Sequence, residues 1–392
     1  MARRMIAAVL TLLILIVPIS GSAVEPFVNA VKVTKPFDEI IEIPNDIATV
    51  IPSDTPSETP SDTPPASVQG VPAPSERSYT YCTPEFITEL YKTQPYKGPK
   101  VISEYLPQAD WKSSDYAVFR DETAAIVKAA ERESGIKSVY GVFVMDPSNG
   151  YYCGVNENLT RTDPDDNAVE GYFNSASVIK LFQGYILCDM MRQGELDRNE
   201  TYYDEVTGRK FKLLNMITYM ISHSDNNYSN AVLRLIGNEK ANEVLTRLGI
   251  YNSRIYGEMS GAMGYSKKNN IEKYGTSKRC ARLTPRDAGL ILYNVYMNRE
   301  TDLYMKMMNE ALLGNIYNTR IPVGVARVNS SYGVAHKTGT NSDLGVYNDA
   351  GIIYCRHPFI LVAFTQSTSV GAGQGFIRNL AERLTRYFDA KN

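Results

Sequence analysis

The sequence contains few of the residues that build metal, redox or nucleic-acid sites. It has 392 residues but only 3 histidines, 5 cysteines and 1 tryptophan, with no Cys-x-x-Cys and no His-x-x-x-His pair. These scarcities argue against a zinc or thioredoxin-like motif, and we expect no metal and no cofactor. The formal net charge is −2 without a basic stripe, so nothing favours binding to nucleic acid.

Long apolar runs are also scarce, and the one near the N-terminus is short. Arg3 and Arg4 precede an apolar run over residues 5–19, and small residues follow as far as Ala23. This order predicts a signal peptide over residues 1–23, because a membrane-spanning helix needs about 20 apolar residues. An uncleaved anchor is the alternative. We therefore expect a secreted or cell-envelope protein with no stable membrane span after the signal is removed.

Composition divides the remaining chain into three parts. Residues 24–78 include a stretch from Pro52 rich in Ser, Thr, Pro and acidic residues, which predicts a disordered, solvated spacer because it has little apolar surface to bury. Residues 79–114 are irregular and rich in Tyr and Pro, which indicates an N-terminal extension. Regular periodicity begins at Asp115, so we expect the folded domain over residues 115–392. Export permits disulfides, but the sequence leaves the pairing open among Cys82, Cys153, Cys188, Cys280 and Cys355.

The periodic part of the chain has strands at both ends and helices between them. Apolar periodicity predicts helices over residues 121–134, 175–194, 212–224, 227–237, 239–249, 284–298 and 375–390. Strand-like patterns cover residues 137–146, 151–158, 333–340, 346–355 and 359–367. We therefore predict one mixed α/β domain of the α+β type, in which the strands from both ends meet in one sheet.

Three short motifs follow one another in this domain. They are Ser177-Val-Ile-Lys180, Ser224-Asp225-Asn226 and Lys337-Thr338-Gly339. The first opens the long helix, the second lies between two helices, and the third lies on the first late strand. Residues three apart on a helix share a face, so the hydroxyl of Ser177 and the amine of Lys180 are expected to meet. A serine hydroxyl needs a neighbouring base, and we expect burial and the charge of Lys337 to lower the pKa of Lys180.

In this order and on these elements, the motifs resemble those of class A β-lactamases and penicillin-binding proteins. The flanking segments NSASVIKLF, MISHSDNNYSNAVL and VAHKTGTNSDLGVYNDAGIIY also resemble this family. The resemblance extends from about Asp115 to Asn392 and leaves the first quarter of the chain outside it. It implies a five-stranded antiparallel sheet flanked by helices, an all-helical lobe, and a site between the two.

The resemblance also implies acyl-enzyme chemistry, and each motif residue has a physical reason to take part. Ser224 is suited to relay a proton to the leaving nitrogen, and Asn226 to hydrogen-bond a substrate amide. The backbone N–H groups of Ser177 and Thr340 are the expected oxyanion donors.

The third motif is expected to bind the substrate. Lys337 and Thr338 are suited to hold a carboxylate, and Gly339 is expected to let the substrate lie close to the strand. One such motif alone is weak evidence, because Ser-x-x-Lys occurs again at residues 134–137, where Gly135 ends a helix. The combination of all three carries the prediction.

One family feature matches incompletely. Class A β-lactamases use a loop glutamate to activate the water that hydrolyses the acyl-enzyme, with an asparagine four residues further on. Glu258 lies near the expected place, but Ala262 stands where the asparagine should be, and Glu272 with Thr276 lies further along. Glu258 is thus the candidate base, with a surface-loop role as the alternative. Without such a glutamate, acylation still occurs but deacylation is slow.

These observations predict a serine hydrolase that opens the β-lactam ring. The alternative is a cell-wall D-Ala-D-Ala peptidase or esterase, or a penicillin-binding protein with slow deacylation; a non-catalytic wall-binding protein is a third possibility, which the intact motifs argue against. A Ser-His-Asp hydrolase is not favoured, because there is no Gly-x-Ser-x-Gly elbow and His223 and His336 are each one residue away from a motif. The expected partner is a small β-lactam or a cell-wall peptide, bound by a monomer.

Overall fold

The computed structural model describes residues 109–155, 173–250, 252–274, 280–366 and 368–391. The predicted signal peptide, the predicted spacer, Cys82 and most of the predicted N-terminal extension lie outside these ranges. Within them, Cys188, Cys280 and Cys355 are free thiols. No helix in the described part of the chain is both long enough and apolar enough to cross a membrane.

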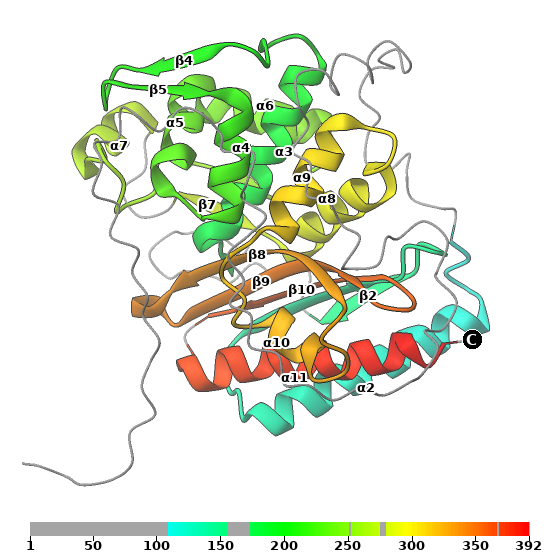
Figure 1. The fold of residues 1–392 in the computed structure, drawn as a ribbon. Coiled ribbons are helices and arrows are strands. Elements are labelled where there is room, and N and C mark those ends of the chain that lie inside the picture. The colour runs from blue at the N-terminus through cyan, green and yellow to red at the C-terminus, as the bar shows by residue number, and fades with distance from the viewer. Residues whose placement is uncertain (1–108, 156–172, 251, 275–279, 367, 392) are drawn as a thin grey trace, which may run out of the picture. The chain divides into compact units, whose positions relative to one another are not determined.

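A five-stranded sheet lies at the centre of the described part (Figure 1). Its strands in spatial order are β2 (Tyr152–Val155), β1 (Tyr140–Met145), β10 (Phe359–Thr365), β9 (Val346–Tyr354) and β8 (Gly333–Asn341). All four neighbouring pairs are antiparallel. The pairing of β1 with β10, in which Phe143 lies opposite Val362, joins the early and late strands. The predicted fold class, with strands from both ends of the domain in one antiparallel sheet, is therefore confirmed.

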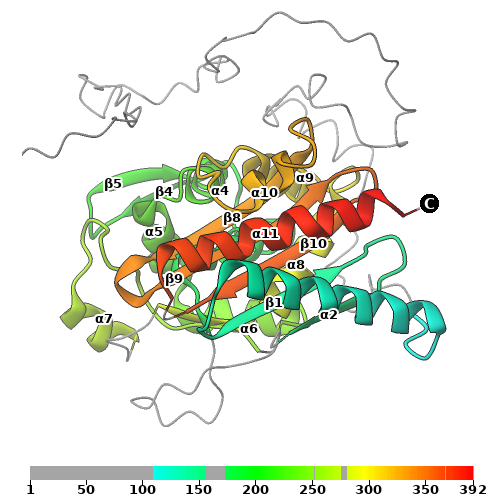
Figure 2. The same ribbon diagram turned by 90° about the horizontal axis from the view of Figure 1, so that it is seen from below.

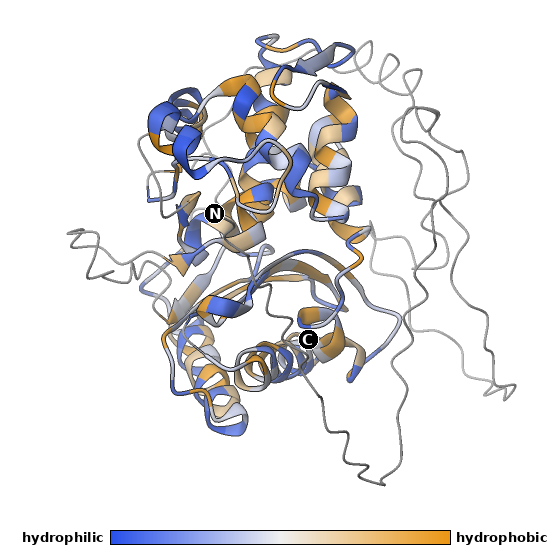
Figure 3. Ribbon diagram, turned by 90° about the vertical axis from the view of Figure 1, so that its left-hand side faces the viewer, coloured by the Kyte–Doolittle hydropathy of each residue, from blue (hydrophilic) through white to orange (hydrophobic). Residues whose placement is uncertain are grey.

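Two long helices and one short helix cover one face of this sheet. They are α2 (Ser114–Ser134), α11 (Val370–Asp389) and α10 (Ile321–Ala326). Figure 2 shows α2 and α11 running side by side across the strands. In α11 the buried residues include Phe376, Leu380 and Leu384, spaced four apart on the face that meets the sheet. Coloured by hydropathy, these helices show the alternation of hydrophilic and hydrophobic residues that is typical of amphipathic helices (Figure 3).

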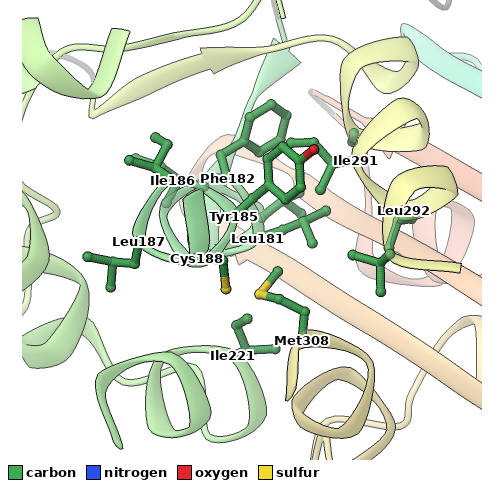
Figure 4. Close-up of a cluster of buried hydrophobic side chains, with 14 of the residues drawn as sticks. Leu181, Phe182, Tyr185, Ile186, Leu187, Cys188, Ile221, Ile291, Leu292 and Met308 are labelled. Atoms are coloured by element: carbon green, nitrogen blue, oxygen red, sulfur yellow. The ribbon is translucent and has the colours of Figure 1, made fainter. Parts of the chain in front are cut away.

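A helical lobe covers the other face, and helix α3 (Ile179–Arg192) is its centre. A 3₁₀ turn, η4 (Ala176–Val178), leads directly into α3. Every residue of α3 except Arg192 is buried, as expected of a helix that is surrounded on all sides. The surrounding helices are α4 (Leu213–Ser222), α5 (Asn226–Ile236), α6 (Asn238–Arg247), α8 (Pro285–Asn298) and α9 (Leu303–Leu313). Figure 4 shows side chains of α3 packed against Ile221 of α4, Leu292 of α8 and Met308 of α9.

The remaining elements are short, and the sequence patterns did not predict them. They are the hairpin of β4 (Thr201–Asp204) and β5 (Arg209–Lys212), the small sheet of β3 (Phe173–Asn174), β7 (Ala281–Leu283) and β6 (Arg254–Ile255), helix α7 (Lys267–Tyr274), and the 3₁₀ turn η5 (Ser342–Leu344). Helices α9 and α10 were also missed. Elements of two to four residues are too short to show a period, so only tertiary contacts define them.

Candidate active site

The segment before α3 fixes the position of Ser177. Ala176 has a positive φ of 41°, and its N–H donates to Oδ1 of Asn174 at 3.0 Å. The carbonyl oxygen of Ser175 accepts the N–H of Val178 at 3.0 Å, which closes the 3₁₀ turn. Ser177 therefore lies in the first turn of a continuous helical segment. N–H groups in a first turn have no helical acceptor, and the helix dipole there favours negative charge.

The hydroxyl of Ser177 and the amine of Lys180 meet, as the three-residue spacing predicted. Lys180 Nζ donates to Ser177 Oγ at 3.0 Å. The same amine lies 2.6 Å from the carbonyl oxygen of Ser224 and 2.6 Å from Oδ1 of Asn226. Lys180 has no exposed surface. Its amine is thus held by oxygen acceptors on two neighbouring elements and directed at the serine.

Burial lowers the pKa of Lys180 to about 7, and the nearby Asp225 carboxylate partly opposes this shift. A large fraction of the amine is therefore neutral near pH 7, as a general base requires. Burial also lowers the pKa of Lys337, and repulsion from Lys180 lowers it further. The sequence prediction assigned part of the shift of Lys180 to Lys337. In the structure, burial is the main cause for Lys180, and the repulsion between the two amines is a smaller effect.

Ser224 lies between these two lysines. Its Oγ is 3.0 Å from Nζ of Lys337 and 3.3 Å from Nζ of Lys180. Ser224 has a positive φ of 56° in the turn between α4 and α5. The next residue, Asp225, caps α5 by accepting the N–H of Asn227 at 2.6 Å. The motif thus combines a helix cap with a hydroxyl that is in contact with both amines, which suits proton transfer.

Strand β8 is an edge strand, and Gly339 brings it against the nucleophile segment. A Cβ at Gly339 would lie 2.6 Å from the carbonyl oxygen of Ser175 and 3.2 Å from the backbone nitrogen of Ser177. The protein's own backbone fills the space that a Cβ would take. That Gly339 lets the substrate lie close to the strand stays a prediction. The close approach places Gly339, the residue before Thr340, against the backbone nitrogen of Ser177.

The two threonines of this strand differ in their surroundings. Thr340 is exposed, and its Oγ1 accepts a hydrogen bond from Arg320. Thr338 is 5% exposed, and its carbonyl oxygen accepts from Lys337 Nζ at 2.9 Å. Among the described residues, no hydrogen bond joins the Thr338 hydroxyl to Ser177 or Ser224.

Sequence reasoning missed Asn348 on β9, which supports the nucleophile segment. Its Nδ2 donates to the carbonyl oxygens of Asn174 and Ser175 at 2.8 and 3.3 Å, and its Oδ1 accepts the N–H of Thr365 at 3.0 Å. Asn348 lies opposite Gly339 in the sheet. The polar pair at 348–349 interrupts an otherwise apolar strand. This interruption is the sequence signal that could have identified Asn348.

Arg320, which precedes α10, was also missed. It is 2% exposed, and its guanidinium donates to the carbonyl oxygen of Asn348 at 2.9 Å as well as to Oγ1 of Thr340. Its Nε has no hydrogen-bond partner, and no carboxylate of the described residues forms an ion pair with it. The sequence carries no signal for this residue, because a single arginine in a loop has no pattern. Its charge lies next to Thr340, where a substrate anion is expected.

Glu258 is held by Arg234 in a buried ion pair. Its two carboxylate oxygens accept from Nε and Nη2 of Arg234 at 3.0 and 2.7 Å, while Nη1 of the same arginine pairs with Asp204 at 2.8 Å. The side chains of Arg234 and Glu258 are 2% and 11% exposed. This is a tight structural contact that occupies both carboxylate oxygens.

The loop that carries Glu258 lies beside helix α5. The carbonyl oxygen of Ser260 accepts from Nδ2 of Asn226 at 3.2 Å, and Glu258 pairs with Arg234 of the same helix. Among the described residues, no hydrogen bond or ion pair joins Glu258 to Ser177 or Lys180. The structure therefore gives Glu258 a structural partner in place of the catalytic contact predicted for it.

The comparisons with known proteins agree with this geometry. The model of the family described as "Beta-lactamase enzyme family" matches residues 122–388. A beta-lactamase from Sphaerobacter thermophilus has 20% identity and a TM-score of 0.53, over 69% of this chain and 98% of that chain. The TLA-3 extended-spectrum beta-lactamase has 16% identity and a TM-score of 0.53, over 68% and 99%.

A third structure is a mutant of PBP-A in an acyl-enzyme complex with penicillin G. It has 16% identity and a TM-score of 0.53, over 69% of this chain and 96% of that chain. At these identities the solved structures show a shared fold. None of the curated protein sequences matches this chain.

Proposed function

Because this chain belongs to the beta-lactamase enzyme family, we propose that it opens β-lactam rings by forming an acyl-enzyme on Ser177. The observation that carries this proposal is the 3.0 Å contact between Lys180 Nζ and Ser177 Oγ. Burial lowers the pKa of that amine to about 7, so a neutral base is in contact with the hydroxyl. This pairing supplies the activation that a serine nucleophile requires.

The first step transfers the Ser177 hydroxyl proton to neutral Lys180 while Oγ bonds to the carbonyl carbon of the lactam. The N–H groups of Ser177 and Thr340 stabilise the negative charge that forms on the carbonyl oxygen. The carbon–nitrogen bond of the ring then breaks. The proton passes from Lys180 through the Ser224 hydroxyl to the ring nitrogen, because Ser224 Oγ is 3.3 Å from Lys180 Nζ. The product is an ester on Ser177.

The carboxylate of the lactam is proposed to bind at the end of the site formed by Lys337, Thr340 and Arg320. Lys337 and Arg320 bring positive charge to this end, and Arg320 and Thr340 are already joined by a hydrogen bond. Thr338 lies on the same strand and completes the predicted set. Asn226 donates one N–H to Ser260, so its second N–H is available for the amide of the substrate.

A second candidate function is slow release, as in a penicillin-binding protein or a D-Ala-D-Ala peptidase or esterase. The observation that favours it is the pairing of Glu258 with Arg234. In the described part of the chain, no carboxylate forms a hydrogen bond or ion pair with Lys180. Water must then attack the ester without a carboxylate base at the position used by class A enzymes, and the acyl-enzyme accumulates.

We further propose that the protein acts as a monomer outside the cytoplasm, either secreted or in the cell envelope. The order of residues 1–23 supports export. Its partner is a small β-lactam or a cell-wall peptide, since both present a carbonyl to a serine and a carboxylate to a cationic end.

The test is the mass of the intact protein, followed over time after mixing with penicillin G. A mass increase by one penicillin on the wild type, and its absence in Ser177→Ala, supports acylation at this serine. Two further observations on the wild type support β-lactam hydrolysis: a rapid return to the starting mass, and turnover of a chromogenic cephalosporin. Ser177→Ala should reduce that turnover by up to ~10⁶-fold. A stable adduct without turnover supports the second candidate. No adduct and no turnover would refute both.

A further inference from the structure

A buried pair of ionisable residues joins β8, the strand that carries Lys337, to β9, and the proposed reaction does not use it. His336 Nδ1 is 2.9 Å from Oδ1 of Asp349, and the two side chains are 1% and 0% exposed. Burying an ion pair is costly, and an apolar pair of the same volume is often equally stable. The stability of the sheet alone therefore does not require such a pair.

The pair connects the sheet to the loop that carries Arg320. The second oxygen of Asp349 accepts the N–H of Ile321 at 3.1 Å, at the first residue of α10. Nε2 of His336 is 3.0 Å from Oδ1 of Asn318, and its carbonyl oxygen accepts from Nδ2 of Asn315 at 2.9 Å. These contacts hold the backbone on both sides of Arg320.

Asp349 is also the carboxylate whose charge acts on both cations of the proposed anion-binding end. It lies on β9 opposite Thr338, next to Lys337 in the ladder. Burial and Lys180 lower the pKa of Lys337, and Asp349 opposes both effects. Burial lowers the pKa of Arg320 as well, and Asp349 again opposes it. The charge of Asp349 itself persists because His336 holds its pKa below the ordinary value against the effect of burial.

The polar and charged groups around Lys337 come from four elements. They are Lys180 of α3, Ser224 of the turn before α5, Asp349 of β9 and Arg320 before α10. Among these only Asp349 is negative. Removing its charge while keeping its shape therefore takes away the carboxylate that raises the pKa of both Lys337 and Arg320.

We propose that Asp349, oriented by His336, is a positioning residue that holds the anion-binding end of the site together and supplies its counter-charge. It does not touch the substrate. It acts through Arg320, whose loop it anchors, and through Lys337, whose positive charge it balances. This inference rests on the proposed function, because it assumes that a lactam carboxylate binds at Lys337 and Arg320.

The test compares acylation of wild type and Asp349→Asn by penicillin G and by its methyl ester, with intact mass as the readout. The ester keeps the reactive ring but lacks the carboxylate. We expect penicillin G to acylate Asp349→Asn about tenfold more slowly than wild type. A tenfold change corresponds to roughly one pKa unit or one weakened charged contact. With the methyl ester, the acylation rate should stay within about twofold of wild type. Asp189→Asn is the matched control. Asp189 is a buried carboxylate paired with Arg247 near the far end of α3, so its loss should not change the acid-to-ester ratio.

The outcomes separate the proposal from the function on which it depends. An equal loss with acid and ester, or no loss with either, overturns the role of Asp349. If Asp349→Asn does not fold, His336→Gln keeps the carboxylate but disturbs its orientation, and must show the same acid-selective loss. If His336→Gln shows no acid-selective loss, the proposal is also overturned. A wild type that is acylated by neither compound overturns the proposed function, and this inference with it.

Discussion

Gly339→Ala adds one methyl group at the point where strand β8 passes closest to the nucleophile. The new Cβ would lie 2.6 Å from the carbonyl oxygen of Ser175, whereas ordinary van der Waals contact begins at 3.4 Å. The strand or the nucleophile segment must therefore move by about 0.8 Å, the difference between these two distances. A misplacement of about 1 Å at a reacting centre can reduce the rate by ~10²-fold. We expect acylation by penicillin to fall by about two orders of magnitude.

The fold should tolerate this change, because Gly339 does not have a positive φ. Overpacking of this kind costs about 1–3 kcal/mol, which thermal unfolding measures. The matched control is Gly371→Ala in the first turn of α11, where nothing lies within 4 Å of the added atom. It should leave the acylation rate unchanged. A folded Gly339→Ala protein that is acylated as fast as wild type would refute the argument that this contact positions Ser177.

Three further predictions concern the base, the misplaced glutamate and the core. The acylation rate at saturating penicillin should rise with pH through a midpoint near 7, because Lys180 accepts a proton only when neutral; a rate that is flat from pH 5 to 9 would contradict this role. Glu258→Gln should leave the rate of acyl-enzyme release within about twofold of wild type, which the decay of the adduct mass measures. It should lower the free energy of unfolding by about 1–3 kcal/mol in urea unfolding, because the Glu258 carboxylate binds Arg234. Leu292→Ala, in the core between α8 and α3, should lower that free energy by about 2–5 kcal/mol in urea unfolding, and a loss under 1 kcal/mol would show that the core relaxes around the gap.

The parts of the fold that could be predicted from the sequence are those with a long, clear period. Helix α2 was expected to end at Gly135, and it does so with that glycine at a φ of 65° in the left-handed region. Its start at Ser114 was missed, although the side chain of Ser113 caps the helix by accepting the N–H of Tyr116. Helix α9 was missed although its buried residues, among them Leu303, Met307 and Ala311, recur every four positions as in a helix.

Some contacts of the site likewise follow from local sequence spacing, whereas others depend on long-range pairing of elements. Ser177 and Lys180 are joined by one helical turn, so the sequence alone predicted their contact. Arg320 and Asn348 reach the site through pairing between β8 and β9 and through a loop. The error at Glu258 has this cause too, because its partner Arg234 lies on another element and the spacing of loop residues does not reveal such pairs.

The position of β10 determines when this protein can become functional during its synthesis. This strand, residues 359–365, is synthesised after the other four strands, yet it forms the middle of the sheet between β1 and β9. Until it emerges, β1 has no partner on that side, and β8 and β9 cannot join the rest of the sheet. Partly made chains therefore expose unpaired strand edges, and chains shortened before residue 359 should aggregate rather than form a smaller enzyme.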